Sequence, residues 1–155
     1  MITIPNSYDS TSGLCKILAV PLSHIESVAV DETGAYANVY IKTDEQIIDI
    51  PIGASDSDWS EEMKETDAGD VYYEKIVGNI RREDEKNRDI IRRLEVGRWL
   101  VLFSDCAGTI RVAGSQEFPL RFLTNRNSKN SNGIQFTMTG AQLHPALIVK
   151  NIDEL

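Results

Sequence analysis

A cysteine, a histidine and an aspartate are the residues of this sequence that could form a catalytic triad. Cys106 directly follows Asp105, and His24 and His144 are the two histidines. A cysteine becomes a nucleophile when a histidine takes its proton and an acid orients that histidine, so the fold would have to join Cys106, His24 and Asp105. Neither histidine lies in a nucleophile motif such as GxSxG. We therefore favour a packed thiol over a triad and predict no catalytic residue.

The two cysteines stand apart in the sequence. Cys15 and Cys106 form no CxxC pair, so neither a zinc site nor a disulfide framework is implied. Unpaired cysteine behaves as a small apolar residue that is often buried. We interpret both side chains as small buried hydrophobic groups.

An acidic stretch in the first half of the chain resembles the start of an EF-hand calcium loop. Asp56, Asp58 and Ser60 take the places of the first three ligands. Glu61 replaces the obligatory glycine, and Asp67 stands where a bidentate glutamate belongs. A solvated acidic loop is the better interpretation, and we predict no metal site.

Basic residues gather between positions 81 and 93. Five arginines lie there: Arg81, Arg82, Arg88, Arg92 and Arg93. Four acidic residues interleave with them: Glu83, Asp84, Glu85 and Asp89. The net charge of the chain is −8, which repels a phosphate backbone. We therefore favour a salt-bridged, solvated helix over a nucleic-acid face. No glycine-rich phosphate-binding motif is present, and we predict no cofactor.

Length and composition indicate one globular domain. The 155 residues are 41% hydrophobic and 26% charged, which is ordinary for a folded protein of this size. We expect a single domain over residues 1–155 with a flexible leader of about 12 residues. The sequence shows neither a membrane-spanning apolar run nor the pattern of a signal peptide, which predicts synthesis in a cytoplasm and no membrane partner.

Periodicity predicts one helix. Apolar and amide side chains at offsets of three, four and seven define a face over about residues 83–96, formed by Asn87, Ile90, Ile91 and Leu94. Acidic residues crowd its first turn and arginines its last, as the helix dipole favours. We expect Gly97 to end the helix in the left-handed conformation.

Alternating apolar residues predict about eight strands around this helix. An early hairpin is expected over 24–30 and 35–41, with its turn at Asp31 to Gly34. Pro51 makes the isoleucine-rich segment 46–52 a sheet edge or a strand end. The remaining strands are expected at residues 14–22, 71–80, 98–104, 109–113, 118–123 and 134–139, with a polar loop over 125–133.

One of these segments is expected to be covered on both sides. Trp99, Val101 and Phe103 share one face of it, and Leu100 and Leu102 share the other. Strands without βαβ alternation favour a mainly β, α+β fold, an antiparallel sandwich or barrel with one flanking α-helix.

The segment from about residue 53 to 70 is predicted to be a long acidic loop. Aspartate, serine, glutamate and glycine dominate it, with Trp59 and Met63 as its large apolar side chains. Long loops in compact domains are usually functional or disordered. Trp59 is expected to dock either on a neighbouring protein or on its own core, and the sequence leaves that choice open.

The second half of the chain resembles tail structural proteins of bacteriophages and prophages. The resemblance covers about residues 70–147, with the stretches "GRWLVLFSDCAGTIRVAGS" and "GIQFTMTGAQLHPAL". It rests on the D-x-x-G turn at Asp105 and Gly108, on Gly114, and on the F-x-x-x-G of Phe136 and Gly140. These features serve a fold more than a reaction, and the first 70 residues have no counterpart in the best-known tube subunits.

This resemblance implies a non-enzymatic virion protein. Such a subunit would assemble into a ring around a DNA passage, as tube, connector or terminator, with copies of itself and with other tail proteins. It would be located in the virion tail, and DNA would pass without specific binding and without a small-molecule substrate. Two alternatives stay open, a monomeric β-rich binding or adaptor module and a small cysteine-dependent hydrolase. The candidate oligomer-interface residues are Trp59, Met63, Tyr72, Tyr73, Phe118 and Phe136.

Overall fold

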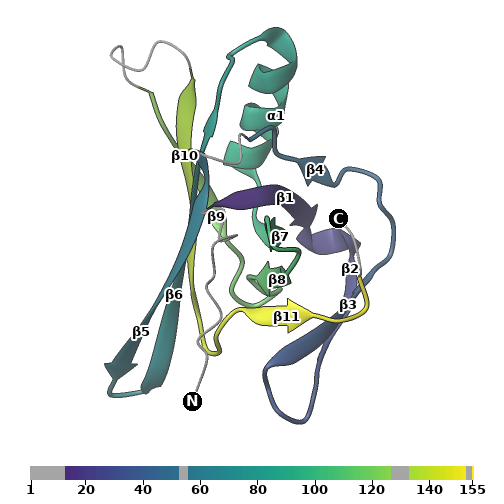
Figure 1. Cartoon of the computed structure of the whole chain (residues 1–155), viewed down its shortest axis with the longest axis vertical. Helices are drawn as coiled ribbons and strands as arrows, with labels where there is room; N and C mark the ends of the chain where they lie inside the picture. Colours follow the sequence, from purple (N-terminus) through teal and green to yellow (C-terminus); the bar gives the residue numbers. More distant parts are fainter. Residues whose placement is uncertain (1–12, 53–55, 127–132, 153–154) are drawn as a thin grey trace, which may run out of the picture.

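The computed structural model describes residues 13–52, 56–126, 133–152 and 155. Over these ranges the chain forms a seven-stranded sheet, a four-stranded sheet and one α-helix (Figure 1). The predicted mainly β, α+β fold with a flanking helix is confirmed, and its sheets form no closed barrel. The predicted leader and the middle of the polar loop, residues 1–12 and 127–132, lie outside the described residues.

The seven-stranded sheet contains both ends of the described chain. Its order is β2-β3-β11-β8-β7-β1-β4. The strands are β1 (Leu14–Pro21), β2 (Ile25–Val30), β3 (Tyr36–Ile41), β4 (Ile48–Asp49), β7 (Trp99–Asp105), β8 (Ile110–Ala113) and β11 (Leu147–Val149). A short 3-10 helix, η1 (Leu22–His24), joins β1 to β2. The predicted β2–β3 hairpin and the predicted edge position of β4 are confirmed.

The four-stranded sheet is antiparallel throughout. Its order is β5-β6-β10-β9. The strands are β5 (Asp58–Thr66), β6 (Gly69–Ile80), β9 (Arg121–Asn125) and β10 (Ile134–Gln142). The described residues thus hold eleven strands, more than the roughly eight expected, and β5 and the short β11 had no matching prediction.

Strand β5 contradicts the predicted acidic loop over residues 53–70. From residue 58 onward this segment is a strand that pairs with β6 from Asp58↔Val77 to Thr66↔Gly69. Most of its charged side chains are exposed on a sheet edge, so its composition is that of a loop although its backbone is hydrogen-bonded to the neighbouring strand. Gly69 closes the turn at φ +118, where a side chain would be strained.

The core between the sheets centres on β7. Trp99, Val101 and Phe103 belong to the hydrophobic cluster shared with the four-stranded sheet and the helix. Leu100 and Leu102 belong to a second cluster on the other face, to which β2 and β3 also contribute. The prediction that this strand is covered on both sides is confirmed.

The helix α1 (Glu85–Val96) covers one end of the inter-sheet core. Asp84 caps its start by accepting a hydrogen bond from the backbone N–H of Asn87 at 2.8 Å. Ile91 and Leu94 are buried, as the periodicity predicts. Within the described ranges, no helix has the length and hydropathy needed to cross a membrane.

Gly97 ends this helix in a different way from the one predicted. Its φ of −95° is not left-handed. A Cβ at this position would lie 2.5 Å from Cζ2 of Trp99, so glycine is needed for close approach to the indole. That indole donates from Nε1 to the backbone O of Leu94 at 2.9 Å, which satisfies one of the free carbonyls of the last turn.

Cys15 and Cys106 form a disulfide bond, which contradicts their interpretation as separate buried residues. The two Cα atoms are 5.1 Å apart although the residues are 91 positions apart in sequence. Antiparallel pairing of β1 with β7 is the cause: the register shifts between Leu14, which lies opposite Asp105, and Lys16, so Cys15 lies in a β-bulge beside the end of β7, where Cys106 follows. The spacing of the two cysteines in the sequence does not predict this contact.

Removal of the disulfide should destabilise the fold. A cross-link that closes so long a loop restricts the unfolded chain, which stabilises the folded state by about 2 to 5 kcal/mol. We expect the Cys15→Ser/Cys106→Ser variant, and the wild type in excess dithiothreitol, to lose free energy of unfolding in that range in urea titrations. Equal unfolding midpoints for the oxidised and the reduced wild type would contradict the prediction.

Candidate functional site

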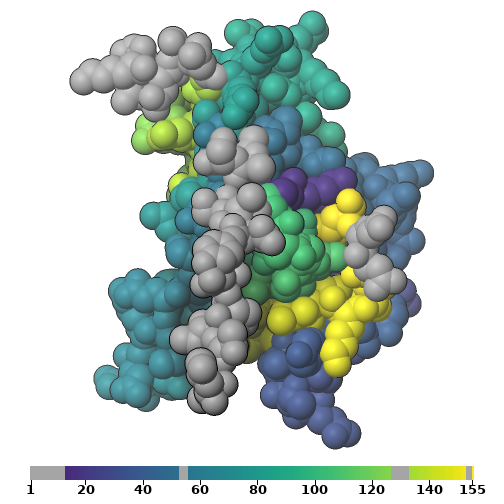
Figure 2. All heavy atoms as spheres, in the orientation of Figure 1, coloured from purple at the N-terminus to yellow at the C-terminus, as the bar shows by residue number. Residues whose placement is uncertain are grey.

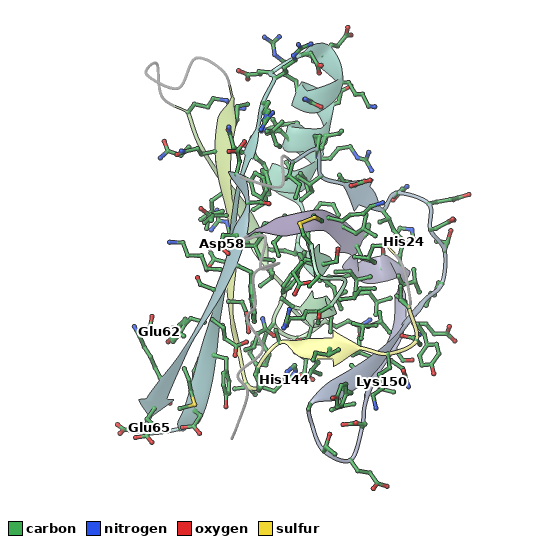
Figure 3. The ribbon with its side chains drawn as sticks, viewed as in Figure 1. His24, Asp58, Glu62, Glu65, His144 and Lys150 are labelled. Atoms are coloured by element: carbon green, nitrogen blue, oxygen red, sulfur yellow. A yellow bond between two sulfur atoms is a disulfide. The ribbon has the colours of Figure 1, made fainter. Side chains whose placement is uncertain are left out.

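The β5–β6 hairpin extends beyond the sandwich. Pairing of β6 with β10 ends at Tyr72↔Gln142, and the turn of the hairpin lies further out at the lower left of Figure 1. We name residues 62–73 the hairpin arm. The side chains of residues 62–70 are all exposed, and Figure 3 shows Glu62 and Glu65 at the outer end. The arm is the most prominent projection that the described residues form.

Trp59 fixes the base of the arm to the chain's own core. Its ring centroid lies 5.4 Å from that of Phe103 on β7. The guanidinium of Arg111 lies 5.0 Å from the centroid of the Trp59 ring. The same guanidinium forms an ion pair with Asp105 at 3.2 Å. Of the two docking modes that the sequence leaves open, the structure has the one in which Trp59 packs on its own core.

A pair of glutamates lies beside Trp59. Glu61 is directly opposite Glu74 in the β5–β6 register, and both face the other sheet. Glu74 is 0% exposed and its Oε2 accepts a hydrogen bond from Nε1 of Trp59 at 2.8 Å. Oε2 of Glu61 accepts from the backbone N–H of Ala146 at 2.8 Å, which ties β5 to the segment before β11.

The second carboxyl oxygen of Glu74 is accounted for by one proton that the two carboxyl groups share. Oε1 of Glu74 is buried and receives no N–H or hydroxyl hydrogen. Burial, together with a hydrogen bond to Glu61, raises the pKa of Glu74 to about 8 against the lowering effect of the Trp59 hydrogen bond. A carboxyl–carboxyl hydrogen bond requires a proton on one partner. Glu74 therefore donates to Glu61 at neutral pH.

The sequence contained a signal for this pair. Glu74, Ile76, Gly78 and Ile80 alternate along β6 and are all buried, so Glu74 is an acid at an inward position of a strand. Because β5 was not predicted to be a strand, the alternation along β6 indicated no second acid that would lie beside Glu74. Gln142 is a second buried polar side chain at the same end of the four-stranded sheet. Its amide donates a hydrogen bond to the backbone O of Phe118 at 2.7 Å.

The six candidate interface residues have different surroundings. Met63 is 54% exposed, and Tyr73 and Phe118 are each 40% exposed. Tyr72 is half-buried opposite Met63. Phe136 is 2% exposed and stacks on Phe122 with centroids 5.1 Å apart, so its side chain is not available to a partner. The structure brings Met63 and Tyr72 together on one face of the arm and places Tyr73 on the other face.

The triad hypothesis is contradicted. Cys106 has no thiol to ionise because its sulfur is bonded to Cys15. His24 follows Pro21, which pairs with Trp99 at the far end of β7 from Asp105, a separation of about 20 Å along the strand. Asp105 instead pairs with Arg111.

The EF-hand reading also fails, because the calcium loop would have to be a compact turn. Asp58 and Ser60 lie in an extended strand, where side chains alternate between faces. Asp56 forms an ion pair with Arg81 at 3.1 Å. Among the described residues, no group of three or more acidic, histidine or cysteine side chains could hold a metal ion.

Substitution of Trp59 should lower stability through two separable contributions. Trp59→Ala removes a large ring from the core and leaves Glu74 without its donor, so we expect a loss of about 3 kcal/mol of unfolding free energy. Trp59→Phe keeps most of the packing and should lose about 1 kcal/mol. Urea titrations would measure both, and a Trp59→Ala variant as stable as the wild type would contradict the docking described here.

The Glu74 proton should make stability depend on pH. The folded state holds this proton more tightly than the unfolded chain, whose ordinary pKa is 4.5. The stabilisation that this group contributes should therefore be fully present below pH 4.5 and be lost as the pH rises to about 8, by at most about 5 kcal/mol. Urea titrations at several pH values would measure it.

Glu74→Gln is the matched variant for this test. Its amide can accept from Trp59 and donate to Glu61 with no proton to lose, so the difference between wild type and variant isolates the Glu74 contribution. The variant should gain stability over the wild type at pH 8, and the exposed-site control Glu62→Gln should keep the wild-type profile. Parallel profiles for wild type and Glu74→Gln would refute the shared proton.

Comparisons with known proteins find no relative of this chain. No protein-family model matches the sequence. Searches of curated proteins and of solved structures find no match either.

Proposed function

We propose that this protein is a non-enzymatic structural subunit of a bacteriophage or prophage tail, which assembles with copies of itself into a ring around a DNA passage. The hairpin arm is the observation that carries the proposal. The arm projects from a two-sheet body with a flanking helix and so offers a surface to a neighbouring copy. The anchor of Trp59 and Glu74 holds the arm in a defined direction, so the arm is pre-organised for a partner.

Exposed apolar side chains gather at the arm end of the four-stranded sheet. Met63 and Tyr73 lie on the arm, while Phe118 precedes β9 and Leu143 follows β10, which both meet the arm end. Leu143 is 64% exposed. Large apolar groups that remain exposed in one region favour a protein–protein contact.

Among the residues that the structure describes, an edge strand without a second partner accompanies these side chains. In the four-stranded sheet β9 forms one edge and is approached by α1, while β5 forms the other edge. The nine residues of β5 leave backbone groups available for pairing with another chain. Its many charges discourage indiscriminate pairing and so favour a specific partner.

The disulfide and the net charge support a virion role further. Disulfides persist in oxidising surroundings, which include virion surfaces. A net charge of −8 repels phosphates, so a ring of such subunits would let DNA pass without retaining it.

A small binding module is the second candidate, and a cleft favours it. The cleft has a volume of about 300 Å³ and is open to solvent. Its walls come from β2, residues 115–118 and the segment around His144, which Figure 3 labels. The volume is at the lower limit for small-molecule pockets, and Phe118 and Leu143 give it an apolar wall.

Substitutions on the arm should separate the two candidates. Met63→Ser/Tyr73→Ser removes two exposed apolar groups, so self-association should weaken at least tenfold, while stability should change by less than about 0.5 kcal/mol. Size-exclusion chromatography with light scattering and negative-stain micrographs of concentrated protein would measure assembly.

Val30→Ser/Tyr40→Ser is the matched control, because these residues of β2 and β3 are 50% and 45% exposed on another hairpin. The control should assemble as the wild type does. A wild type that stays monomeric in solution and also occurs as single copies in its native particle would refute the ring and favour the binding module.

A further inference from the structure

The hairpin arm carries acidic groups without nearby cations. Four acidic residues lie on the arm, Glu62, Glu65, Asp67 and Asp70, against the single base Lys64. Lys64 approaches Glu62 at 4.0 Å. Among the described residues, Glu65, Asp67 and Asp70 form no ion pair within 4.0 Å. Glu65 and Asp70 lie opposite each other on the face of the arm that carries Met63, so this face presents uncompensated negative charge, whereas Lys64 lies over the Tyr73 ring on the other face.

The last turns of α1 carry the opposite charge. Arg92, Arg93 and Arg98 are exposed and, within the described part of the chain, form no ion pair. We name these three residues the basic ridge. Val96 lies among them and is 66% exposed, the largest exposed fraction among the large apolar side chains described. A basic surface with an exposed apolar group in it matches the acidic face of the arm, which carries Met63.

The arm and the ridge cannot meet within one molecule. Figure 1 shows α1 at one end of the longest axis and the tip of the β5–β6 hairpin at the other, and Figure 2 shows the body of the molecule between them. The ridge lies where α1 leads into β7, far from the tip of the arm, so these two complementary surfaces meet only in a contact between copies. Contacts of that kind are heterologous, and they continue as rings or helical tubes.

We propose that the hairpin arm of one copy binds the basic ridge of the next copy, head to tail. This inference rests on the proposed function and names the contact by which the subunit assembles. Arg92 and Arg93 face the arm carboxylates, and Val96 packs against the apolar side chains of the arm. Because these charges are exposed, screening by salt weakens the contact.

A nucleic acid is the other partner that a basic ridge could suit. The chain as a whole repels phosphates through its net charge of −8, and Glu95 and Asp89 lie close to the ridge in sequence. A second copy with an acidic arm has the opposite charge and is present at the same concentration. The observations therefore favour the second copy.

Charge reversal gives a complementation test. An arm variant, Glu62→Lys/Glu65→Lys, has two basic ends, and a ridge variant, Arg92→Glu/Arg93→Glu, has two acidic ends. Each alone should lose the large species seen by light scattering at low salt, because like charges meet. An equimolar mixture should recover them, since each reversed surface meets an opposite one. Assembly of the wild type should decrease when the salt is raised from 50 to 500 mM.

A control variant and two contradicting outcomes distinguish a failure of this contact from a failure of the proposed function. Glu32→Lys/Glu45→Lys makes the same change of charge at exposed positions on and after the β2–β3 hairpin and should leave assembly intact. Variants that each assemble alone, or a mixture that stays monomeric beside an assembling wild type, would overturn the head-to-tail contact and leave the ring proposal standing.

Two further outcomes are decisive. A ridge variant that assembles normally but no longer retards a DNA fragment in a gel would assign the ridge to nucleic acid and overturn the contact. A wild type that is monomeric at every salt concentration would also overturn it, and micrographs of the native particle would then decide the proposed function separately.

Discussion

The contact of Trp59 with Phe103 and Glu74 determines the direction of the β5–β6 hairpin. It is a local anchor at the one place where β5 enters the inter-sheet core. Outward from it, β5 is held mainly by backbone pairing with β6, so its side chains are free to be charged. The same anchor buries Glu74 and forces it to share a proton with Glu61. Core packing, the buried acid and the exposed arm are consequences of one docking geometry.

Much of the framework could be predicted from the sequence because alternation and helical periodicity report burial directly. β7 shows this well, since its five successive apolar residues divide between two faces as predicted. The helix was predicted within two residues of its observed bounds, because Asp84 supplies a recognisable cap. These signals are local, and each is complete within about a dozen residues.

The rest depends on contacts between distant segments, which no local pattern records. β5 has the composition of a loop and becomes a strand only because β6 lies beside it. Cys15 reaches Cys106 through the β1–β7 register, and Glu61 meets Glu74 in the same way. Gly97 was predicted to be needed for a left-handed backbone conformation, whereas its lack of a side chain makes room for the indole of Trp99. Phe136, which was predicted to lie in the oligomer interface, is buried in the core for a similar reason.

The position of the disulfide has a mechanical consequence. Cys15 is the second residue of β1, and its partner lies directly after the last residue of β7. Tension applied through the preceding residues would reach this covalent link before it reached the rest of β1. The strand could then not be peeled from β7 one hydrogen bond at a time, and the load would pass into the centre of the sheet.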